Sequence, residues 1–445
     1  MAPREIDRGA FERLQASIDP EWIEEALAWS GTASLRKRRL PAEQVIWLVL
    51  GMALFRDRSI HELTEKLDIA RPGSGGRSVA RSASSQARER LGDEALAWLF
   101  QRSALKWAGE SARRHSWRGL ALFGLDGTSI RVPDSTANRE YFGGQGAGTS
   151  HGQSGYPLVR LVTLMALRSH LLHSARFGPH QQSELALAKL LWSQIPDDSL
   201  LVADRNFLAA CVLIPITREG NNRHWLTRAK KNTRWRVIRQ LGKGDELVEM
   251  DVSSEARAKD PSLPKTWVAR AIRYCRPGFR PQTLLTSLLD PSLHPAEEIV
   301  ALYHERWEIE LGYGEVKRYM LESMEAIRSK SPMKVSQELW GIAIAYNLVR
   351  LEMEHAAGLA KVPPTRISFI AAYRLIRDEW LWAEVTSPGA IPKHLRRLRE
   401  NIAEMILPPR RRQRSYPRAV KIKMSNYPRK RPRRRSRRLT DRHCV

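Results

Sequence analysis

Between positions 303 and 317, four residues that could act on an anionic substrate recur at fixed intervals. Tyr303, Arg306, Glu310 and Lys317 stand at offsets of 0, 3, 7 and 14. On an α-helix, where successive residues are separated by about 100°, these offsets fall within an arc of about 60°. The cationic side chains suit phosphate oxygens, and a carboxylate suits a divalent cation. The pattern therefore predicts one polar helix face, which is either a phosphate-binding surface or a solvated ion-pair ladder built on Arg306 and Glu310.

The other residues of this predicted helix divide into two further faces. An apolar stripe is expected to pack on the core and consists of Leu302, Ile309, Val316 and Met320. Three acidic residues are expected to face water, namely Glu305, Glu308 and Glu315. A helix with three such faces could hold the Tyr-Arg-Glu-Lys row toward a substrate while its apolar stripe anchors it.

Two aspartates each end an apolar run. Asp126 ends GLALFGLD and Asp204 ends SLLVAD. We expect each at the carboxyl end of a strand, where a side chain leaves the packed sheet, although a turn-forming aspartate is an equal alternative. With Glu310 they would offer oxygen ligands to divalent cations, and two such ions about 4 Å apart can activate a water or a 3′-hydroxyl against a phosphodiester. Asp126, Asp204 and Glu310 are thus the predicted catalytic and metal-binding residues.

The elements that must position these residues divide the chain into three predicted parts. Residues 1–112 follow a helical period, as in PAEQVIWLVLGMALF. Residues 113–385 alternate apolar strands with amphipathic helices, which is typical of a mixed α/β domain, and short charged strands at about 232–275 indicate a β insertion. Residues 386–445 form a C-terminal region that ends in a disordered basic tail. The predicted fold class is therefore α/β with a helical N-terminal domain.

The N-terminal part offers a second candidate for substrate binding. Two short helices followed by an arginine-bearing helix resemble a helix-turn-helix arrangement. In that arrangement Arg81, Arg88 and Arg90 would face DNA. A small helical bundle with the same arginines on its solvent face explains the pattern equally well.

The net charge of +26 points to a polyanionic partner. From Arg410 to Arg442 there are sixteen Lys and Arg residues against the single acid Asp441, which leaves a net charge of +11 for the rest of the chain. Each cation laid against a phosphate releases a condensed counterion, so we expect nucleic acid as the partner. A solvated tail that only keeps the protein soluble is the alternative.

Composition also bears on the compartment. The longest uncharged apolar run is eleven residues from Val45, short of the roughly 18 that a membrane span needs, so no membrane contact is expected. Cys211, Cys275 and Cys444 are far apart, which suits a reducing compartment and argues against a disulfide framework or a zinc site. A cytoplasmic protein is the expectation.

The spacing Tyr-x2-Arg-x3-Glu-x6-Lys resembles the signature of one branch of bacterial insertion-sequence transposases with an Asp-Asp-Glu (DDE) active site, insertion-sequence family four. The segments LDGTSIRVPD around Asp126 and LVADRNF around Asp204 are similar to the first and second acidic motifs of that family. The intervals of 78 residues from Asp126 to Asp204 and 106 from Asp204 to Glu310 are similar to those of a ribonuclease-H-like core with a β insertion before the glutamate. The resemblance covers roughly residues 20 to 380.

The resemblance implies a cut-and-paste DNA transposase. Asp126, Asp204 and Glu310 would hold two Mg²⁺ ions, with Mn²⁺ as a possible substitute. Tyr303, Arg306 and Lys317 would grip the DNA backbone near the cleaved transposon end. The N-terminal domain would recognise the inverted repeats of double-stranded DNA, and hydrolysis, hairpin formation and joining to target DNA would follow.

The resemblance also implies an aromatic residue of the β insertion that stacks on a flipped base. Trp235 and Trp267 are the candidates for this DNA contact, and a core tryptophan is the alternative for each. Because two ends must be joined, a homodimer assembled on DNA is expected, in association with the bacterial nucleoid. Two other functions stay open, a structure-specific nuclease on the same core and a catalytically inactive basic protein that binds DNA or RNA.

Histidines and glycines in the middle of the chain carry weaker signals. His170, His173 and His180 have ligand-like spacing, but a β-hairpin is predicted there and its turn places them unpredictably, so no metal site is expected. The glycines from Gly143 to Gly148 match no phosphate-loop pattern and indicate a flexible loop.

Overall fold

The computed structural model describes most of the chain between residues 18 and 408. The described stretches are residues 18–33, 40–66, 80–144, 155–276, 280–321, 326–382 and 391–408. The basic tail from Arg410 to Arg442 and most of the glycine-rich loop lie outside them, so what the sequence predicts for these segments stays a prediction.

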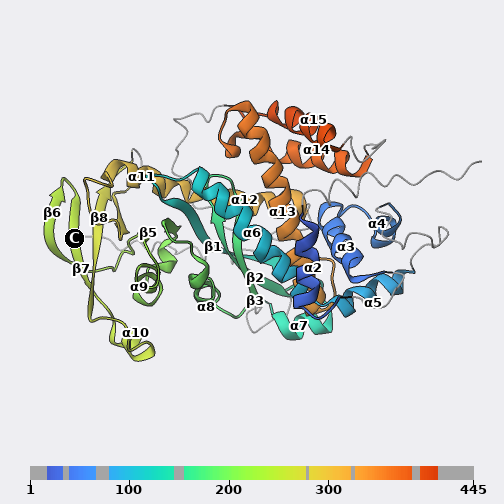
Figure 1. The fold of residues 1–445 in the computed structure, drawn as a ribbon. Helices are drawn as coiled ribbons and strands as arrows, with labels where there is room; N and C mark the ends of the chain where they lie inside the picture. Colours follow the sequence, from blue (N-terminus) through green and yellow to red (C-terminus); the bar gives the residue numbers. More distant parts are fainter. Residues whose placement is uncertain are drawn as a thin grey trace, which may run out of the picture.

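One mixed sheet runs through the molecule, and Figure 1 shows it extending from the insertion strands at one end to the N-terminal helices at the other. Within the described residues it has nine strands in the order β3-β2-β1-β4-β5-β9-β8-β7-β6. The strands are β1 (Ala121–Arg131), β2 (Leu158–Ala166), β3 (Leu172–Pro179), β4 (Ser199–Ala203), β5 (Arg223–Arg228), β6 (Arg236–Gly242), β7 (Asp245–Asp251), β8 (Thr266–Tyr274) and β9 (Gln282–Thr286).

The connections of the first five strands define the fold. β1, β2 and β3 form an antiparallel meander, and β4 and β5 then add parallel to β1. This order and these directions are those of a ribonuclease-H-like core, so the predicted fold class is confirmed. The predicted insertion is also found, because β6, β7 and β8 leave the core after β5 and β9 returns antiparallel to β5.

Helices cover both faces of the core strands. One face carries α6 (Glu94–Arg114), α12 (Trp307–Glu315) and α13 (Pro332–Ala360), and the other carries α8 (Glu184–Lys189) and α9 (Ala210–Arg218). Along β1 the apolar residues alternate between the two layers, with Leu122 in the core on the α13 side and Phe123 in the core on the α8 side. Period-two alternation in a strand that is buried on both faces explains the continuous apolar run before Asp126.

Two glycines allow α12 to lie close to the sheet. A β-carbon at Gly124 of β1 would come within 2.6 Å of Leu167 and 3.4 Å of Ile309, and one at Gly312 of α12 would come within 2.5 Å of Met165 on β2. The contacts with Leu167 and Met165, both under 3 Å, would force these side chains to move. Gly312 weakens the helix by about 1 kcal/mol relative to Ala, and this close approach is the compensating gain.

The segment around residues 303–317, predicted as one helix, is broken. α11 (Ala296–Glu305) ends before Arg306, α12 follows, and a π-helical turn, η3 (Val316–Met320), continues the chain. The predicted apolar stripe is confirmed, since Leu302, Ile309, Val316 and Met320 are all buried. The predicted acidic face is wrong, because Glu308 is buried and Glu305 and Glu315 are bonded to residues of other elements.

The N-terminal helices pack against α13 and α6, directly or through α3, rather than forming an isolated unit (Figure 1). The N-terminal ones are α2 (Pro20–Trp29), α3 (Ala42–Leu54), α4 (Ile60–Lys66) and α5 (Arg81–Leu91); α7 (Thr136–Phe142) and α10 (Ser254–Lys259) are short, and α14 (Phe369–Trp382) and α15 (Ile391–Ala403) lie near the end. α3, α6 and α15 all pack on α13, which is why α13 is apolar on most of its circumference. The predicted boundaries at residues 112 and 385 remain predictions.

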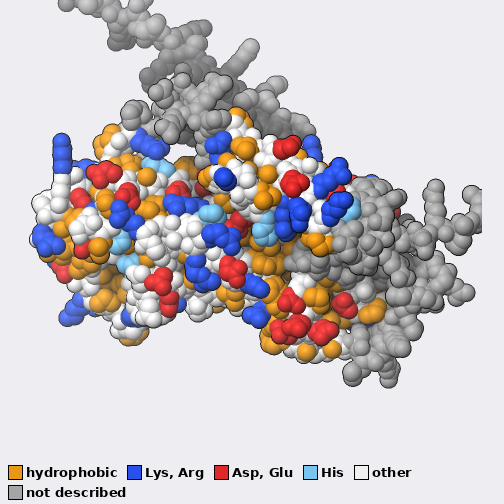
Figure 2. All heavy atoms as spheres, turned by 45° about the horizontal axis from the view of Figure 1, so that its top comes forward, with side chains coloured by type: hydrophobic (Ala, Val, Ile, Leu, Met, Phe, Trp, Pro, Cys, Tyr) orange, Lys and Arg blue, Asp and Glu red, His pale blue; other side chains and the backbone are white. Residues whose placement is uncertain are grey.

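In the described stretches, every helix is too short or too polar to span a lipid bilayer. Figure 2 shows basic side chains interspersed with acidic ones on the visible face, so the positive charge there is spread rather than gathered into one patch.

Candidate active site

Asp126 and Asp204 come together because β1 and β4 are parallel neighbours. The last paired residues of the two strands are Leu125 and Ala203, and the two aspartates are the next residue on each strand. Asp204 follows the end of β4 as predicted. The prediction that Asp126 ends its strand is wrong, since β1 continues to Arg131 through its antiparallel pairing with β2.

The carboxyl of Asp126 lies in a partly closed environment. It accepts a hydrogen bond from the Gly127 N–H at 2.8 Å, and the Tyr313 hydroxyl donates to the Asp126 carbonyl at 2.6 Å. Burial raises the pKa of this carboxyl from 3.8 to about 6. The Gly127 hydrogen bond and the Arg306 charge oppose the rise, and the nearby carboxylates Glu184 and Glu310 add to it. The site therefore favours either a proton or another cation at Asp126.

Arg306 supplies a cation to all three predicted acids. Its Nη2 lies 3.0 Å from Glu310 Oε1, and its charge also interacts with Asp126 and Asp204. Burial alone would lower the pKa of the Arg306 guanidinium, but the groups around it outweigh this and the pKa is raised. The three carboxylates thus share one positive charge, which sits at the break between α11 and α12.

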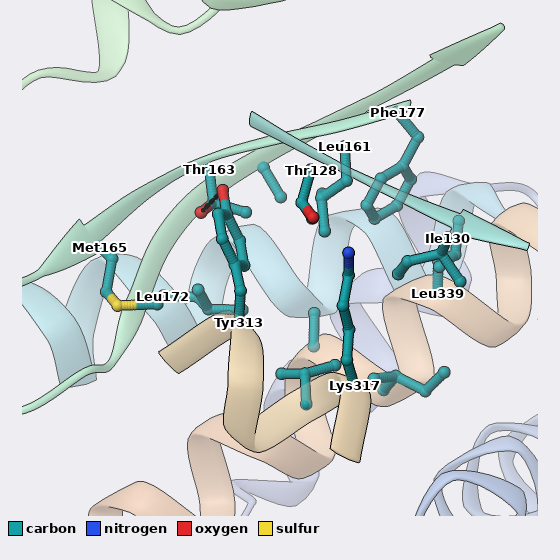
Figure 3. A pocket seen from close by; sticks show the side chains of 14 residues that line it. Thr128, Ile130, Leu161, Thr163, Met165, Leu172, Phe177, Tyr313, Lys317 and Leu339 are labelled. Carbon is teal, nitrogen blue, oxygen red and sulfur yellow. Dashed lines mark hydrogen bonds between the residues drawn. The ribbon is translucent and has the colours of Figure 1, made fainter. Parts of the chain in front are cut away.

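The four signature residues occupy different environments. Tyr303 is buried, and burial raises the pKa of its hydroxyl. The Glu310 side chain is 41% exposed, so it is open to a ligand from solution. Lys317 lies on η3, and its side chain extends toward β1 into an apolar cavity that Thr128 and Tyr313 also line (Figure 3). Tyr303, Arg306 and Glu310 therefore flank the two aspartates, whereas the Lys317 side chain points into the apolar cavity beside β1 and β2.

The acids are not arranged as a preformed metal cage. Within the described residues, no group of three or more His, Cys, Asp or Glu side chains is placed to hold a metal ion. The donor set nevertheless suits a hard divalent cation, because it consists of carboxylate oxygens alone. The guanidinium of Arg306 pairs with Glu310 and interacts electrostatically with Asp126 and Asp204, so a positive charge of the protein lies beside the three acids.

The prediction that Arg88 faces DNA is wrong. Arg88 is 4% exposed, and its Nε donates to Gln337 at 2.6 Å and its Nη2 to Ser329 at 3.0 Å. α5 packs this face against the start of α13, so the residue ties two helices together. Arg90 on the same helix is exposed, and the side chain of Arg81 lies outside the described residues.

Both tryptophans of the insertion are half-buried and pack on the edge of the core, but their neighbours differ. Trp267 packs against Trp225, with ring centroids 5.3 Å apart, at the margin of the core. Trp235, just before β6, lines a polar pocket of about 220 Å³ together with Gln240, Lys243, Glu246 and Arg273. An aromatic ring beside polar and charged groups is the more suitable of the two for contact with a base.

Sequence reasoning missed Glu184 at the start of α8. A β-carbon at Gly127 would come within 2.6 Å of the Glu184 Cδ, so this carboxylate lies directly against the strand beside Asp126. Its Oε1 forms an ion pair with the Arg160 Nη1 at 3.7 Å. Ser183 caps the helix in front of it, and an SE pair at a helix start is so common that nothing in the sequence distinguished Glu184 from a capping acid.

Comparison with known proteins gives the family. Residues 8–101 match the family model described as insertion element 4 transposase N-terminal, and residues 117–348 match the transposase DDE domain. The transposase InsG of insertion sequence element IS4 from Escherichia coli (strain K12) is 40% identical over 426 residues, covering 95% of this chain and 94% of that protein. The putative transposase InsZ of the same organism is 39% identical over 226 residues, covering 51% of this chain and 73% of that one.

Among solved structures, a piggyBac transposase in a synaptic complex with hairpin DNA is 13% identical, with a TM-score of 0.41 over 91% of this chain and 86% of that one. A similarity this low carries no weight beside the sequence matches. The DDE model spans more than half of the chain and includes Asp126, Asp204 and Glu310. By these matches the chain belongs to the IS4 family of DDE transposases.

Proposed function

We propose that this transposase moves its insertion sequence by a cut-and-paste reaction in which Asp126, Asp204 and Glu310 are the catalytic acids. Membership of the family makes the chain an enzyme of DNA transposition that uses divalent metal. The observation that carries the assignment of residues is the adjacency of Asp126 and Asp204 at the end of the β1–β4 pairing, opposite the Arg306–Glu310 pair. Neither a nuclease nor an inactive binding protein is favoured by the family matches.

The three acids would hold two Mg²⁺ ions, or Mn²⁺ in their place. Bound there, the ions would activate the attacking oxygen and stabilise the leaving oxygen of the phosphodiester. The all-oxygen donor set and the shared interaction with Arg306 support this assignment. The raised pKa of Asp126 supports it further, because a carboxyl that resists ionisation in the free protein gains most from a cation.

The cationic and phenolic residues would position the DNA strand. The Nε of Arg306 is buried and has no hydrogen-bond partner among the described residues. One N–H of the guanidinium is therefore unused, and a phosphate oxygen that enters the site could accept a hydrogen bond from it. Tyr303 lies beside Arg306 and near Asp204, where its hydroxyl could donate to the same backbone. Lys317 would add a second cation from η3.

Regions outside this cluster would recognise the ends of the element. We assign inverted-repeat binding to the helical N-terminal region, with Arg90 and Arg81 as contacts, and base stacking in the insertion to Trp235 in preference to Trp267. Two ends have to be joined, so a homodimer assembled on DNA is the proposed active form. Joining to the target would then complete the reaction.

Linear DNA that carries the two inverted repeats flanking the gene provides the test. Incubated with the protein and Mg²⁺ or Mn²⁺, it should yield hairpin and strand-joined products on denaturing gels. Nicks without joining would support a nuclease, and retardation on native gels without cleavage would support a binding protein.

Glu310→Gln should abolish cleavage and leave gel retardation unchanged, because it removes a metal ligand and keeps the shape. Glu255→Gln on α10, whose exposed side chain pairs with Lys259, is the matched control and should cleave normally. Cleavage retained by Glu310→Gln would exclude the assignment of the acids.

A further inference from the structure

We propose that the β2–β3 turn, Arg168-Ser169-His170, is a clamp that fixes α12 relative to α11 and so positions Glu310 beside the two aspartates. The inference rests on the proposed catalytic role of Glu310. It assigns a positioning function to residues that lie more than 130 positions away in the sequence. None of the three turn residues belongs to the catalytic signature.

The break between the helices makes such a clamp necessary. At the junction, the Arg306 N–H bonds to the Tyr303 carbonyl at 3.3 Å and the Ile309 N–H bonds to the Arg306 carbonyl at 3.3 Å, both three residues apart. These long bonds replace regular helical ones at this point. Since η3 also departs from α-helical geometry, contacts with other elements must set the position of α12.

Arg168 holds the first helix. Its Nε and Nη2 each donate to one carboxylate oxygen of Glu305, the last residue of α11, at 2.9 Å. Its Nη1 donates to the carbonyls of His115 at 3.0 Å and Ser116 at 3.3 Å. A two-pronged arginine–carboxylate pair fixes orientation as well as distance, so α11 is tied to the turn.

His170 holds the second helix. Its Nε2 lies 2.9 Å from Glu308 Oε2 and its Nδ1 lies 3.3 Å from Glu315 Oε2, and both acids belong to α12. Each ring nitrogen of His170 thus faces a carboxylate of α12. Its side chain is 3% exposed, and its backbone φ is +62°, a conformation that non-glycine residues adopt at a cost.

α13 fixes the β2–β3 turn through side chains that contact the turn and Glu315. Arg350 donates from Nε to the Ser169 carbonyl at 2.7 Å, and its Nη1 lies 3.5 Å from Glu315. Tyr346 donates to the same Glu315 at 2.7 Å. The clamp is therefore fixed to the longest helix of the described structure, and a movement of α12 would break several buried charged contacts together.

The clamp contacts the side of α12 that lies opposite Glu310. At about 100° per residue, Glu308 and Glu315 lie about 160° and 140° around the helix from Glu310. Glu310 thus stays open to solution while its two acidic neighbours are held. A shift of about 1 Å at a catalytic group can cost about 100-fold in rate, so loss of this support should appear in the chemistry.

Charge reversal at the exposed end of the clamp tests the proposal. Arg168 and Glu305 are 33% and 30% exposed, so reversing them should not prevent folding. Arg168→Glu should lower the single-turnover cleavage rate by about 10- to 100-fold with DNA affinity within about twofold. It should also speed amide hydrogen exchange over residues 303–315. The double variant Arg168→Glu/Glu305→Arg should recover most of the rate and of the protection.

Arg139→Glu is the matched control, since Arg139 is 32% exposed and bonded to Asp134 on its own segment. It should change neither readout. His170→Gln should resemble Arg168→Glu at the other end of the clamp. Unchanged exchange in Arg168→Glu and His170→Gln, or faster exchange with full cleavage, would overturn the proposal.

The readouts separate this inference from the proposed function. If Glu310→Gln cleaves normally, the catalytic assignment is lost and the clamp has no catalytic group to position, whatever the exchange data show. If Glu310→Gln is inactive and the reversed pair fails to restore Arg168→Glu, the clamp is wrong and the catalytic assignment stands.

Discussion

Asp126 and Asp204 stand at the same level on neighbouring parallel strands, each one residue beyond the last pair that joins β1 to β4. Parallel pairing brings their side chains to one place although 78 residues separate them in the chain. β4 ends at this level, whereas β1 continues because β2 still pairs with it. Beyond the end of β4, the charge of Arg306 interacts with both aspartates.

Asp126→Asn and Asp204→Asn should each lower the cleavage rate by on the order of 1,000-fold or more, because each removes an ionised ligand at the reacting phosphate. DNA affinity should change little. Single-turnover cleavage of end-containing DNA and native-gel retardation measure the two quantities. Asp251→Asn, on an exposed position at the end of β7, is the control and should behave as wild type. A single aspartate variant with wild-type cleavage would remove that residue from the site.

The raised pKa of Asp126 predicts an unusual pH dependence of stability in the absence of divalent metal. Its pKa is about 6 in the folded protein against 3.8 as the ordinary value. Between these values the folded state binds more protons than the unfolded state at this site, so its contribution to stability falls as the pH rises and the penalty is complete above about pH 6. The shift corresponds to about 3 kcal/mol at most.

Asp126→Asn removes this penalty. Chemical denaturation in EDTA should therefore show the variant gaining up to about 3 kcal/mol over wild type near neutral pH and little below about pH 4. Adding Mg²⁺ should narrow the difference, since only wild type has the carboxylate. Equal stability of the two proteins at every pH would show that Asp126 ionises normally.

Glu184→Gln should lower the pKa of Asp126, because one of the two carboxylates that raise it becomes neutral. The acid limb of the cleavage pH profile should then move to lower pH, with a smaller change at the optimum. Cleavage rates measured against pH at saturating DNA give the displacement of the acid limb directly. Glu255→Gln should leave the acid limb in place, and so would Glu184→Gln if Glu184 were only a capping residue.

Sequence patterns pointed to the proposed acids but not to their surroundings. Asp126, Asp204 and Glu310 were predicted because apolar runs that end in acids and a fixed signature are local patterns. The ribonuclease-H-like order of strands followed from the same resemblance. In contrast, Glu308 and Glu315 were assigned to water, since periodicity shows only which residues share a face and not that His170 and Arg350 meet that face.

The helix break shows a second limit. Nothing in the residues around Arg306 is a proline or a strong breaker, so the periodic pattern predicts a continuous helix. At the observed break the Arg306 guanidinium pairs with Glu310 and interacts with Asp204, and the contacts that hold the two helices come from the β2–β3 turn and α13. Tertiary contacts of this kind override local preference, and they are spread over residues too distant for a sequence pattern to reveal.

Arg306→Lys should separate charge from geometry at the centre of the site. Lysine keeps one positive charge but loses the planar fork that can reach Glu310 and a phosphate together. The cleavage rate should fall by about 10- to 100-fold, and thermal unfolding should show that the variant is still folded under the assay conditions. Lys393→Arg on the exposed part of α15 is a control of the same chemical kind. Full activity of Arg306→Lys would mean that a point charge suffices.

Arg88 and Arg90 form a matched pair that tests the role of α5. Arg88→Ala should destabilise the protein by about 2–4 kcal/mol, because the buried Gln337 and Ser329 lose their charged partner. Arg90→Ala should change the free energy of unfolding by no more than about 0.5 kcal/mol, because the side chain is exposed. The same variant should bind inverted-repeat DNA more weakly than wild type, and its affinity should depend less on salt concentration. Thermal unfolding and retardation assays at two salt concentrations distinguish the two variants. If Arg90→Ala binds the repeats as tightly as wild type, α5 serves packing alone and the DNA contacts of the N-terminal region must come from another helix.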